Sequence, residues 1–272
     1  MANLLSKRMN LMCDNIRFVQ NVEIGNSILK YIGTKVIEMK RGAKYSASLD
    51  GCEACIVVLK GKANVYVGDK KYENIGTRSN IFDKNPTDSV YIANKDKFTI
   101  TSDSNNKILI AYALTNEIKK SQLILAHDNL CEDRGKGMNK RHVNNMLGPS
   151  NNISDKLIVV EVYTDEANWS SYPPHKHDVD SDEETLLEEI YYHEMDKPQG
   201  FVFQRVYTDD LTLDETMTVC NEDLVLVPKG YHPVGVPYGY NSYYLNVMAG
   251  PTNNWKFHNQ KEHEWILERE DV

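Results

Sequence analysis

Short apolar or alternating runs rich in Val, Ile and Tyr recur along the chain, separated by Gly, Asn, Asp and Pro. Runs of this kind between turn-forming residues are typical of β-strands, and few stretches show the 3.6-residue period of an amphipathic helix. The expected strands are Lys30–Ile37, Ile56–Leu59, Ala63–Val67, Ser89–Ile92, Ile108–Leu114, Lys156–Tyr163, Ile190–His193, Phe201–Tyr207, Leu224–Val227 and Tyr243–Val247. Helices are expected only at Glu117–Ala126 and at Glu262–Glu268. The pattern predicts an all-β protein with peripheral helices.

A polar stretch in the middle of the chain divides this pattern into two halves. Residues 128–152 are rich in Gly, Asn, Arg and Lys and poor in apolar runs, which predicts a connector between domains at 1–127 and 153–272. A length of 272 residues agrees with two domains. The segments Asp88–Asn94 and Asp223–Lys229 echo each other, each before a later apolar strand. A duplicated β unit would explain that echo.

Charge and composition narrow the choice of partners and of cellular location. The chain has 31 Lys+Arg against 39 Asp+Glu, a net charge of −8, which argues against sequence-blind binding to nucleic acid or an anionic membrane. No apolar run exceeds Ile108–Leu114, and Met1–Asn15 does not resemble a signal peptide. Five scattered cysteines are read as reduced thiols, and the pair Cys52 and Cys55 as packing groups on opposite faces of a strand. We expect a cytoplasmic protein with no membrane partner.

The histidines are distributed unevenly, because all eight lie beyond residue 126. His175 and His177 are two residues apart, so that in an extended chain both imidazoles leave the same face and can share one ion. His232 follows a tight Pro-Lys-Gly-Tyr turn at the end of an apolar strand. Glu189 stands at the head of the strand Ile190–His193 and can point inward. These residue types predict a divalent metal site in the second half of the chain.

Longer segments around these residues resemble a known family. They are Asn168–Asp178, Gly200–Asp210, Val227–Val234 and Tyr243–Pro251, with Asn74–Ser79 and Pro86–Ile92 in the first half. Together they are similar to the 5-deoxy-glucuronate isomerase family of bacterial inositol catabolism, which belongs to the cupin superfamily. The resemblance implies a bicupin, two tandem cupin barrels of which only the C-terminal one binds metal. It places the metal ligands at His175, His177, Glu189 and His232. The long spacing between His177 and Glu189 leaves Glu188 or His193 as an alternative ligand.

The same resemblance implies an aldose–ketose isomerisation of 5-deoxy-D-glucuronate to 5-dehydro-2-deoxy-D-gluconate, with no nucleotide cofactor. Three His and one Glu would close a tetrahedral zinc, so a catalytic ion needs five or six ligands. We expect Zn or Mn, with Fe, Co or Ni as alternatives. For the base that moves a proton between adjacent carbons, His193 ranks first, ahead of Glu188 and Glu194. Other metal-cupin activities on a sugar acid, such as a related uronate isomerase or a dioxygenase, and a sugar-acid sensor are the alternative functions.

The expected partner is a small sugar acid, whose carboxylate needs a cationic group in the cavity. Arg205 ranks first because apolar strand residues flank it, although a salt bridge to Asp or Glu would explain it equally well. Lys229, Arg134 and Arg141 are the other candidates for this role. Tyr243 and Asn246 are candidates for binding hydroxyl groups. A homo-oligomer is compatible with the sequence.

Overall fold

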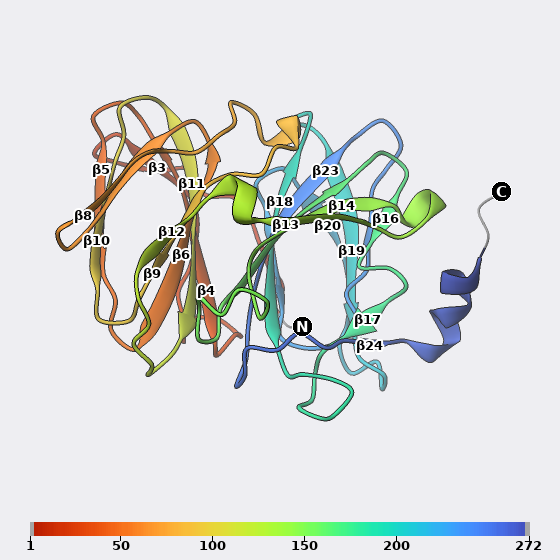
Figure 1. The fold of residues 1–272 in the computed structure, drawn as a ribbon. Coiled ribbons are helices and arrows are strands. Elements are labelled where there is room, and N and C mark those ends of the chain that lie inside the picture. Colours follow the sequence, from red (N-terminus) through yellow and green to blue (C-terminus); the bar gives the residue numbers. More distant parts are fainter. Residues whose placement is uncertain (1–2, 270–272) are drawn as a thin grey trace.

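Two β-barrels, one from each half of the chain, lie side by side in the computed structural model, which describes residues 3–269 (Figure 1). Each barrel consists of a seven-stranded sheet facing a four-stranded sheet, and an additional two-stranded ribbon pairs β17 with β24. All pairings between named strands are antiparallel. The prediction of an all-β protein is therefore confirmed.

The first half of the chain contributes short and medium-length strands. They are β1 Leu5–Ser6, β2 Leu11–Cys13, β3 Ile16–Val22, β4 Ile32–Met39, β5 Lys44–Ser48, β6 Cys52–Lys60, β7 Ala63–Val67, β8 Lys70–Ile75, β9 Ser89–Ile92, β10 Lys97–Thr101, β11 Asn106–Leu114 and β12 Gln122–Ile124. Two single-turn 3-10 helices, η1 Ile81–Asp83 and η2 Ala126–Asp128, lie in the connections.

The second half of the chain also consists mainly of short and medium-length strands. Its strands are β13 Leu130–Arg134, β14 Arg141–Leu147, β15 Ile158–Thr164, β16 Trp169–Ser170, β17 His175–Lys176, β18 Glu188–Met195, β19 Phe201–Tyr207, β20 Asp214–Cys220, β21 Leu224–Val227, β22 Val234–Gly235, β23 Ser242–Ala249 and β24 His258–Asn259. The 3-10 helices are η3 Gly137–Asn139 and η4 Lys261–Glu268. No helix of the described part of the chain is long and apolar enough to cross a membrane.

The two barrels repeat one topology. The large sheets have the orders β12-β9-β6-β11-β4-β3-β2 and β1-β21-β18-β23-β15-β14-β13, and the small sheets β5-β10-β7-β8 and β16-β22-β19-β20. The echo between the two halves of the sequence thus corresponds to equivalent strands β9 and β21. One edge strand crosses over, because β1 from the start of the chain pairs with β21 of the second barrel.

Two expectations about local structure need correction. The stretch Glu117–Ala126 is not a helix. Its residues Gln122–Ile124 form β12, which pairs with β9, and Ile118 is exposed while Ile124 is buried. Completing the edge of the first large sheet stabilises this segment more than a short isolated helix would be stabilised. Residues 128–152 contain β13 and β14, which extend the second large sheet as counterparts of β2 and β3. This stretch is therefore part of a sheet rather than a separate connector.

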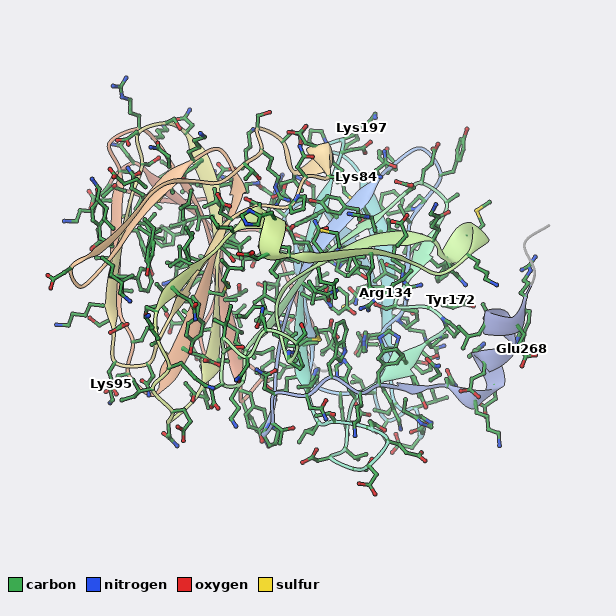
Figure 2. All side chains as sticks on the ribbon, in the orientation of Figure 1. Lys84, Lys95, Arg134, Tyr172, Lys197 and Glu268 are labelled. Carbon is green, nitrogen blue, oxygen red and sulfur yellow. The ribbon has the colours of Figure 1, made fainter. Side chains whose placement is uncertain are left out.

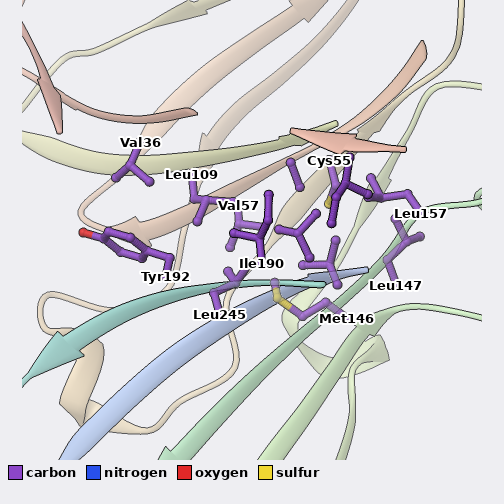
Figure 3. Packing of buried hydrophobic residues seen from close by; sticks show 14 of the residues in the cluster. Val36, Cys55, Val57, Leu109, Met146, Leu147, Leu157, Ile190, Tyr192 and Leu245 are labelled. Carbon is purple, nitrogen blue, oxygen red and sulfur yellow. The ribbon is translucent and has the colours of Figure 1, made fainter. Parts of the chain in front are cut away.

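The large sheets pack against each other, so that their central strands are buried on both faces. Every residue of β18 and β23 is buried. One face of these strands lines the interior of the second barrel, and the other packs on the first barrel in a shared apolar cluster (Figure 3). Val36, Val57 and Leu109 of the first barrel meet Ile190 and Leu245 of the second in that cluster. Strands covered on both sides are read in sequence as continuous apolar runs.

Two glutamates fasten the barrels to each other in a reciprocal manner. Glu53 of β6 is buried and accepts hydrogen bonds from the backbone N–H groups of Asp155, Lys156 and Leu157, at 2.6–2.9 Å. Glu188, at the equivalent place on β18, accepts hydrogen bonds from the backbone N–H groups of Lys30 and Tyr31 at 2.8–2.9 Å. Each carboxylate thus satisfies backbone donors at the start of the partner barrel's strand, which fixes how the large sheets are aligned.

Candidate metal centre

Three buried side chains of the second barrel converge on one point. Nε2 of His177 lies 3.0 Å from Oε2 of Glu189, and Nε2 of His232 lies 3.2 Å from the same oxygen. The exposed fraction of each side chain is 2% or less. Within residues 3–269 these are the three His, Cys, Asp or Glu residues whose ligand atoms gather within 4.8 Å.

Each histidine is oriented by a hydrogen bond from its other ring nitrogen. Nδ1 of His177 lies 2.8 Å from the carbonyl oxygen of Leu187, and Nδ1 of His232 lies 2.8 Å from that of Gly230. With Nδ1 held at a carbonyl oxygen, Nε2 of each ring is turned toward Glu189. Histidines that bind metals are held in this way.

The backbone around these ligands explains the long spacing between His177 and Glu189. The N–H of Leu187 donates to the carbonyl of His177, at 3.0 Å, so the intervening residues form a loop that leaves and returns to the same place. Glu184 stabilises that loop by accepting from the N–H groups of Asp178 and Val179. The insertion therefore brings His177 next to β18 without disturbing the strand.

A glycine shapes the turn that carries His232. Gly230 has a φ of +96°, and a Cβ on it would lie 2.5 Å from the carbonyl oxygen of Tyr207. Its N–H donates to the carboxylate of Asp178, at 2.6 Å. Only glycine fits this left-handed position against a backbone oxygen. The turn and the His175–His177 segment are thereby tied together.

The charges at this site support a metal ion. Burial by itself would raise the pKa of Glu189, but His232 and His177 outweigh burial and lower that pKa to about 2. Nε2 of His232 is buried, and its 3.2 Å contact with Glu189 does not have the geometry of a hydrogen bond. Two imidazole nitrogens and one ionised carboxylate oxygen are a donor set that first-row divalent ions bind. These residues could hold such an ion.

His175, the fourth predicted ligand, lies beside this cluster. Its ring centroid is 5.0 Å from that of His232 and 4.7 Å from that of Phe257. Burial, with His232 and His177 close by, lowers the pKa of His175, so that its ring is neutral and able to bind a metal. It reaches the same pocket as Glu189.

The pocket beside the cluster opens inside the second barrel. Its lining is part apolar and part polar and consists of Arg134, Arg141, Val143, Val160, Val162, Ser171, His175, Glu189, Tyr191, Tyr244, Asn246 and Trp255. Figure 2 labels Arg134 and, near it in the same barrel, Tyr172. Because polar groups converge there beside the metal-ligand cluster, this cavity is the candidate site for a ligand.

The structure does not bring two of the predicted bases to this pocket. Glu188 and Glu194 lie on the face of β18 that packs on the first barrel, opposite to Glu189. Glu188 binds backbone N–H groups there, and Glu194 lies 2.7 Å from Nζ of Lys107. Because side chains alternate along a strand, even-numbered positions of β18 cannot reach the barrel interior. Both glutamates hold the barrels together instead.

His193 shares the inward face of β18 but lies deeper in the barrel. It is fully buried, its ring stacks on that of Tyr191 at 5.8 Å, and its Nε2 lies 3.0 Å from Oε1 of Gln204. Burial lowers the pKa of His193 to about 4, so that its ring is neutral. Glu189 and Tyr191 are the residues of this face that line the pocket, and His193 does not line it.

Three of the predicted substrate-binding residues lie away from the pocket. Arg205 points outward from β19, where Nε and Nη2 donate to the carboxylate of Asp214 at 2.7 and 2.9 Å, as the salt-bridge alternative anticipated. Lys229 lines a separate surface hollow with Asp214. Tyr243 donates to Glu161 between the barrels, at 2.7 Å. Tyr243 and Asn246 are three residues apart on one strand and face opposite ways, so only Asn246 reaches the pocket.

Sequence reasoning missed several residues of the pocket. Tyr244 lies directly across from His193 in the sheet and shares the inward face of Asn246, so the parity of β23 could have indicated it. Ser171 and Trp255 come from loops, and no periodic pattern marks them. The carbonyls that orient the histidines carry no sequence signal, because every residue has a carbonyl group.

Comparisons with known proteins agree with this architecture. The chain is 54% identical over 271 residues to the 5-deoxy-glucuronate isomerase of Lacticaseibacillus casei. The alignment covers 99% of this chain and all of the relative. An IolB-like protein of Salmonella typhimurium, solved as a crystal structure, superposes with a TM-score of 0.93 at 41% identity and covers 97% of this chain and 99% of its own.

A more distant structure has the same fold. The oxalate decarboxylase of Bacillus subtilis, at 11% identity, superposes with a TM-score of 0.67 over 95% of this chain and 80% of its own. That similarity confirms the predicted bicupin fold. The model of the KduI/IolB family matches residues 4–266, which confirms the resemblance seen in the sequence. With nearly its whole length matched, the chain belongs to the KduI/IolB family.

Proposed function

We propose that this protein is a metal-dependent isomerase that converts 5-deoxy-D-glucuronate to 5-dehydro-2-deoxy-D-gluconate in inositol catabolism. The observation that carries the proposal is full-length identity of 54% to a relative named 5-deoxy-glucuronate isomerase. The buried His177, Glu189 and His232 beside a polar pocket support it, because an aldose–ketose conversion needs charge stabilisation at neighbouring substrate oxygens.

We assign the ion to His177, Glu189 and His232, with His175 as a fourth ligand. A divalent ion bound there would act as a Lewis acid that polarises the substrate carbonyl. Zn or Mn is the expected metal, with Fe, Co and Ni as alternatives, since all accept imidazole and carboxylate ligands. No nucleotide cofactor is required, because the oxidation of one carbon balances the reduction of its neighbour within the same molecule.

The pocket also supplies a group that can hold a proton. The hydroxyl of Tyr191 lies 2.9 Å from Oγ of Ser171, and either atom can donate. Tyr191 is buried, lines the pocket and shares the inward face of β18 with Glu189. Burial raises the pKa of Tyr191 and keeps its hydroxyl protonated, so we assign to it the role of donating a hydrogen bond to a substrate oxygen; Glu188 and Glu194, two of the predicted bases, face the other barrel. His193 stacks on the Tyr191 ring and fixes its orientation.

We also propose a cytoplasmic location, supported by five free cysteines in the described residues. The ligand that binds in the pocket is then a small sugar acid present in the cytoplasm. The net charge of −8 gives no support to a nucleic-acid partner.

Incubation of the metal-loaded protein with 5-deoxy-D-glucuronate, followed by proton NMR, tests the activity. We expect the aldehyde signal to disappear as the signals of the 2-deoxy ketose acid grow. Reaction in D₂O is expected to place deuterium at the carbon that receives the proton, because a side chain that carries the proton from one carbon to the next exchanges it with solvent. An unchanged substrate spectrum with metal-replete protein would refute the proposed reaction. A product without deuterium would refute proton transfer through a side chain that exchanges with solvent.

A further inference from the structure

Two arginines stand directly opposite each other in the second barrel. Arg134 of β13 pairs with Arg141 of β14 in the sheet register, and both line the pocket beside the metal-ligand cluster. Like charges at directly opposed positions destabilise a sheet unless something compensates them. An anion between the two guanidinium groups would supply that compensation.

Arg141 has no carboxylate partner within residues 3–269. Its Nη1 donates only to backbone carbonyls, those of Asn139 at 3.0 Å and Tyr172 at 3.4 Å. Burial lowers the pKa of Arg141, and the neighbouring Arg134 lowers it further. A partly buried guanidinium without a paired carboxylate is unfavourable and attracts an anion.

Arg134 is held in place by contacts that involve only part of its guanidinium group. Its Nε and Nη2 donate to Glu132, the former at 2.9 Å, and its guanidinium lies 5.2 Å from the ring centre of Trp255. These contacts fix the plane of the guanidinium and leave Nη1 for a ligand. A fixed guanidinium plane suits a carboxylate, whose two oxygens match the spacing of guanidinium N–H groups.

A polar atom of the pocket lining also lacks a partner. Oδ1 of Asn246 is buried without a hydrogen bond and belongs to the pocket lining. An acceptor left open in a pocket suits a hydroxyl group of a ligand.

We propose that Arg141 and Arg134 bind the terminal carboxylate of the substrate, with Asn246 accepting from a hydroxyl in the middle of its chain. The ligand class is a sugar acid whose carbonyl end lies at His177, Glu189 and His232 and whose carboxylate lies between the two arginines. This inference rests on the proposed function and replaces Arg205 as the carboxylate-binding residue. The pair selects acids over neutral sugars.

The test compares D-glucuronate with D-glucose, which have the same carbonyl end and differ in the carboxylate. Their binding to the metal-loaded protein is measured by titration calorimetry, with kcat and KM for 5-deoxy-D-glucuronate in parallel. We expect wild type to bind D-glucuronate at least about tenfold more tightly than D-glucose, as a charge-assisted pair implies. Arg141→Gln is expected to remove this preference and to raise KM by a similar factor. Arg134→Gln is expected to reduce the preference in part.

Arg205→Gln is the matched control, because Arg205 lies on the same barrel but pairs with Asp214 on the surface. Arg205→Gln is expected to leave the affinities for both sugars and the KM for 5-deoxy-D-glucuronate unchanged. Equal binding of the two sugars by wild type would overturn the inference, and so would an unchanged preference in a folded Arg141→Gln. The wild-type comparison holds even where Arg141→Gln fails to fold. An Arg141-dependent preference for D-glucuronate without turnover of 5-deoxy-D-glucuronate would refute the proposed function but keep the acid-binding site.

Discussion

A buried ion pair between the barrels provides the sharpest test of how the fold is held together. Arg78 of the first half and Glu161 of β15 form a salt bridge whose side chains are both fully buried. Nη1 of Arg78 also donates to the hydroxyl of Tyr163 at 2.7 Å, and Tyr243 donates to Glu161 at 2.7 Å. Burial opposes the charge of Arg78, but the Glu161 carboxylate outweighs burial and raises the pKa of the guanidinium.

Replacing Glu161 with Leu would leave the guanidinium of Arg78 buried without its counter-ion. Removing one partner of a buried pair costs about 3–5 kcal/mol of unfolding free energy. At about 2–4 °C per kcal/mol for a chain of this size, Tm is expected to fall by roughly 6–20 °C. The double variant Arg78→Met/Glu161→Leu removes both charges and is expected to recover most of this loss, since well-packed apolar replacements of buried pairs are often neutral.

The assay is thermal unfolding followed by circular dichroism, with urea unfolding to obtain the free energy. A second ion pair between the two halves serves as control, because Lys84, labelled in Figure 2, lies 2.7 Å from Asp165 with both side chains exposed. Lys84→Ala is expected to cost at most about 1 kcal/mol. The reasoning is refuted if Glu161→Leu is as mild as Lys84→Ala, or if the double variant is no more stable than Glu161→Leu alone.

Three further predictions concern the metal, the barrel contact and acid. His232→Ala is expected to lose the bound divalent ion, measured by mass spectrometry of the metal content, whereas His142→Ala on the surface keeps it; retention of metal by the former would contradict the ligand assignment. Glu53→Gln is expected to lower unfolding free energy by about 2–4 kcal/mol in urea, because three backbone donors lose a charged acceptor, and a loss below ~0.5 kcal/mol would contradict it. Burial would raise the pKa of Glu38, but its bond to Arg17 helps to hold that pKa below its ordinary 4.5, so the ionised form stabilises the fold above that pH and this stability is lost as the pH falls. Between about pH 5 and pH 3, Glu38→Gln is expected to lose less unfolding free energy than wild type, and parallel losses would disprove this.

The pattern of apolar and polar residues along the chain was enough to predict the class of the fold and the position of the central strands. Ile108–Leu114 and Leu224–Val227 are strands because covered sheets require continuous apolar runs, and this requirement is local. The segment Glu117–Ala126 was misread for the opposite reason. Its state depends on the open edge of β9, which lies far away in sequence.

The site divides in the same way. His177 and His232 could be predicted as candidate ligands because metals bind few residue types, and the parity of β18 favoured Glu189 over Glu188; the structure gathers these three side chains. Parity applied to β23 would also have separated Asn246 from Tyr243. These conclusions need only the alternation of side chains along one strand.

The strand pattern, the restriction of histidines to the second half and the residue types able to hold a metal all follow from the order of residues along the chain. Which arginine faces the pocket depends instead on how distant strands pair. Arg205, flanked by apolar residues, lies beside Asp214 on a neighbouring strand, whereas Arg141, in a stretch expected to be a connector, lines the pocket. Charge partners come from other strands, and sheet pairing between distant segments fixes them, so local sequence carries no record of which charges remain unpaired.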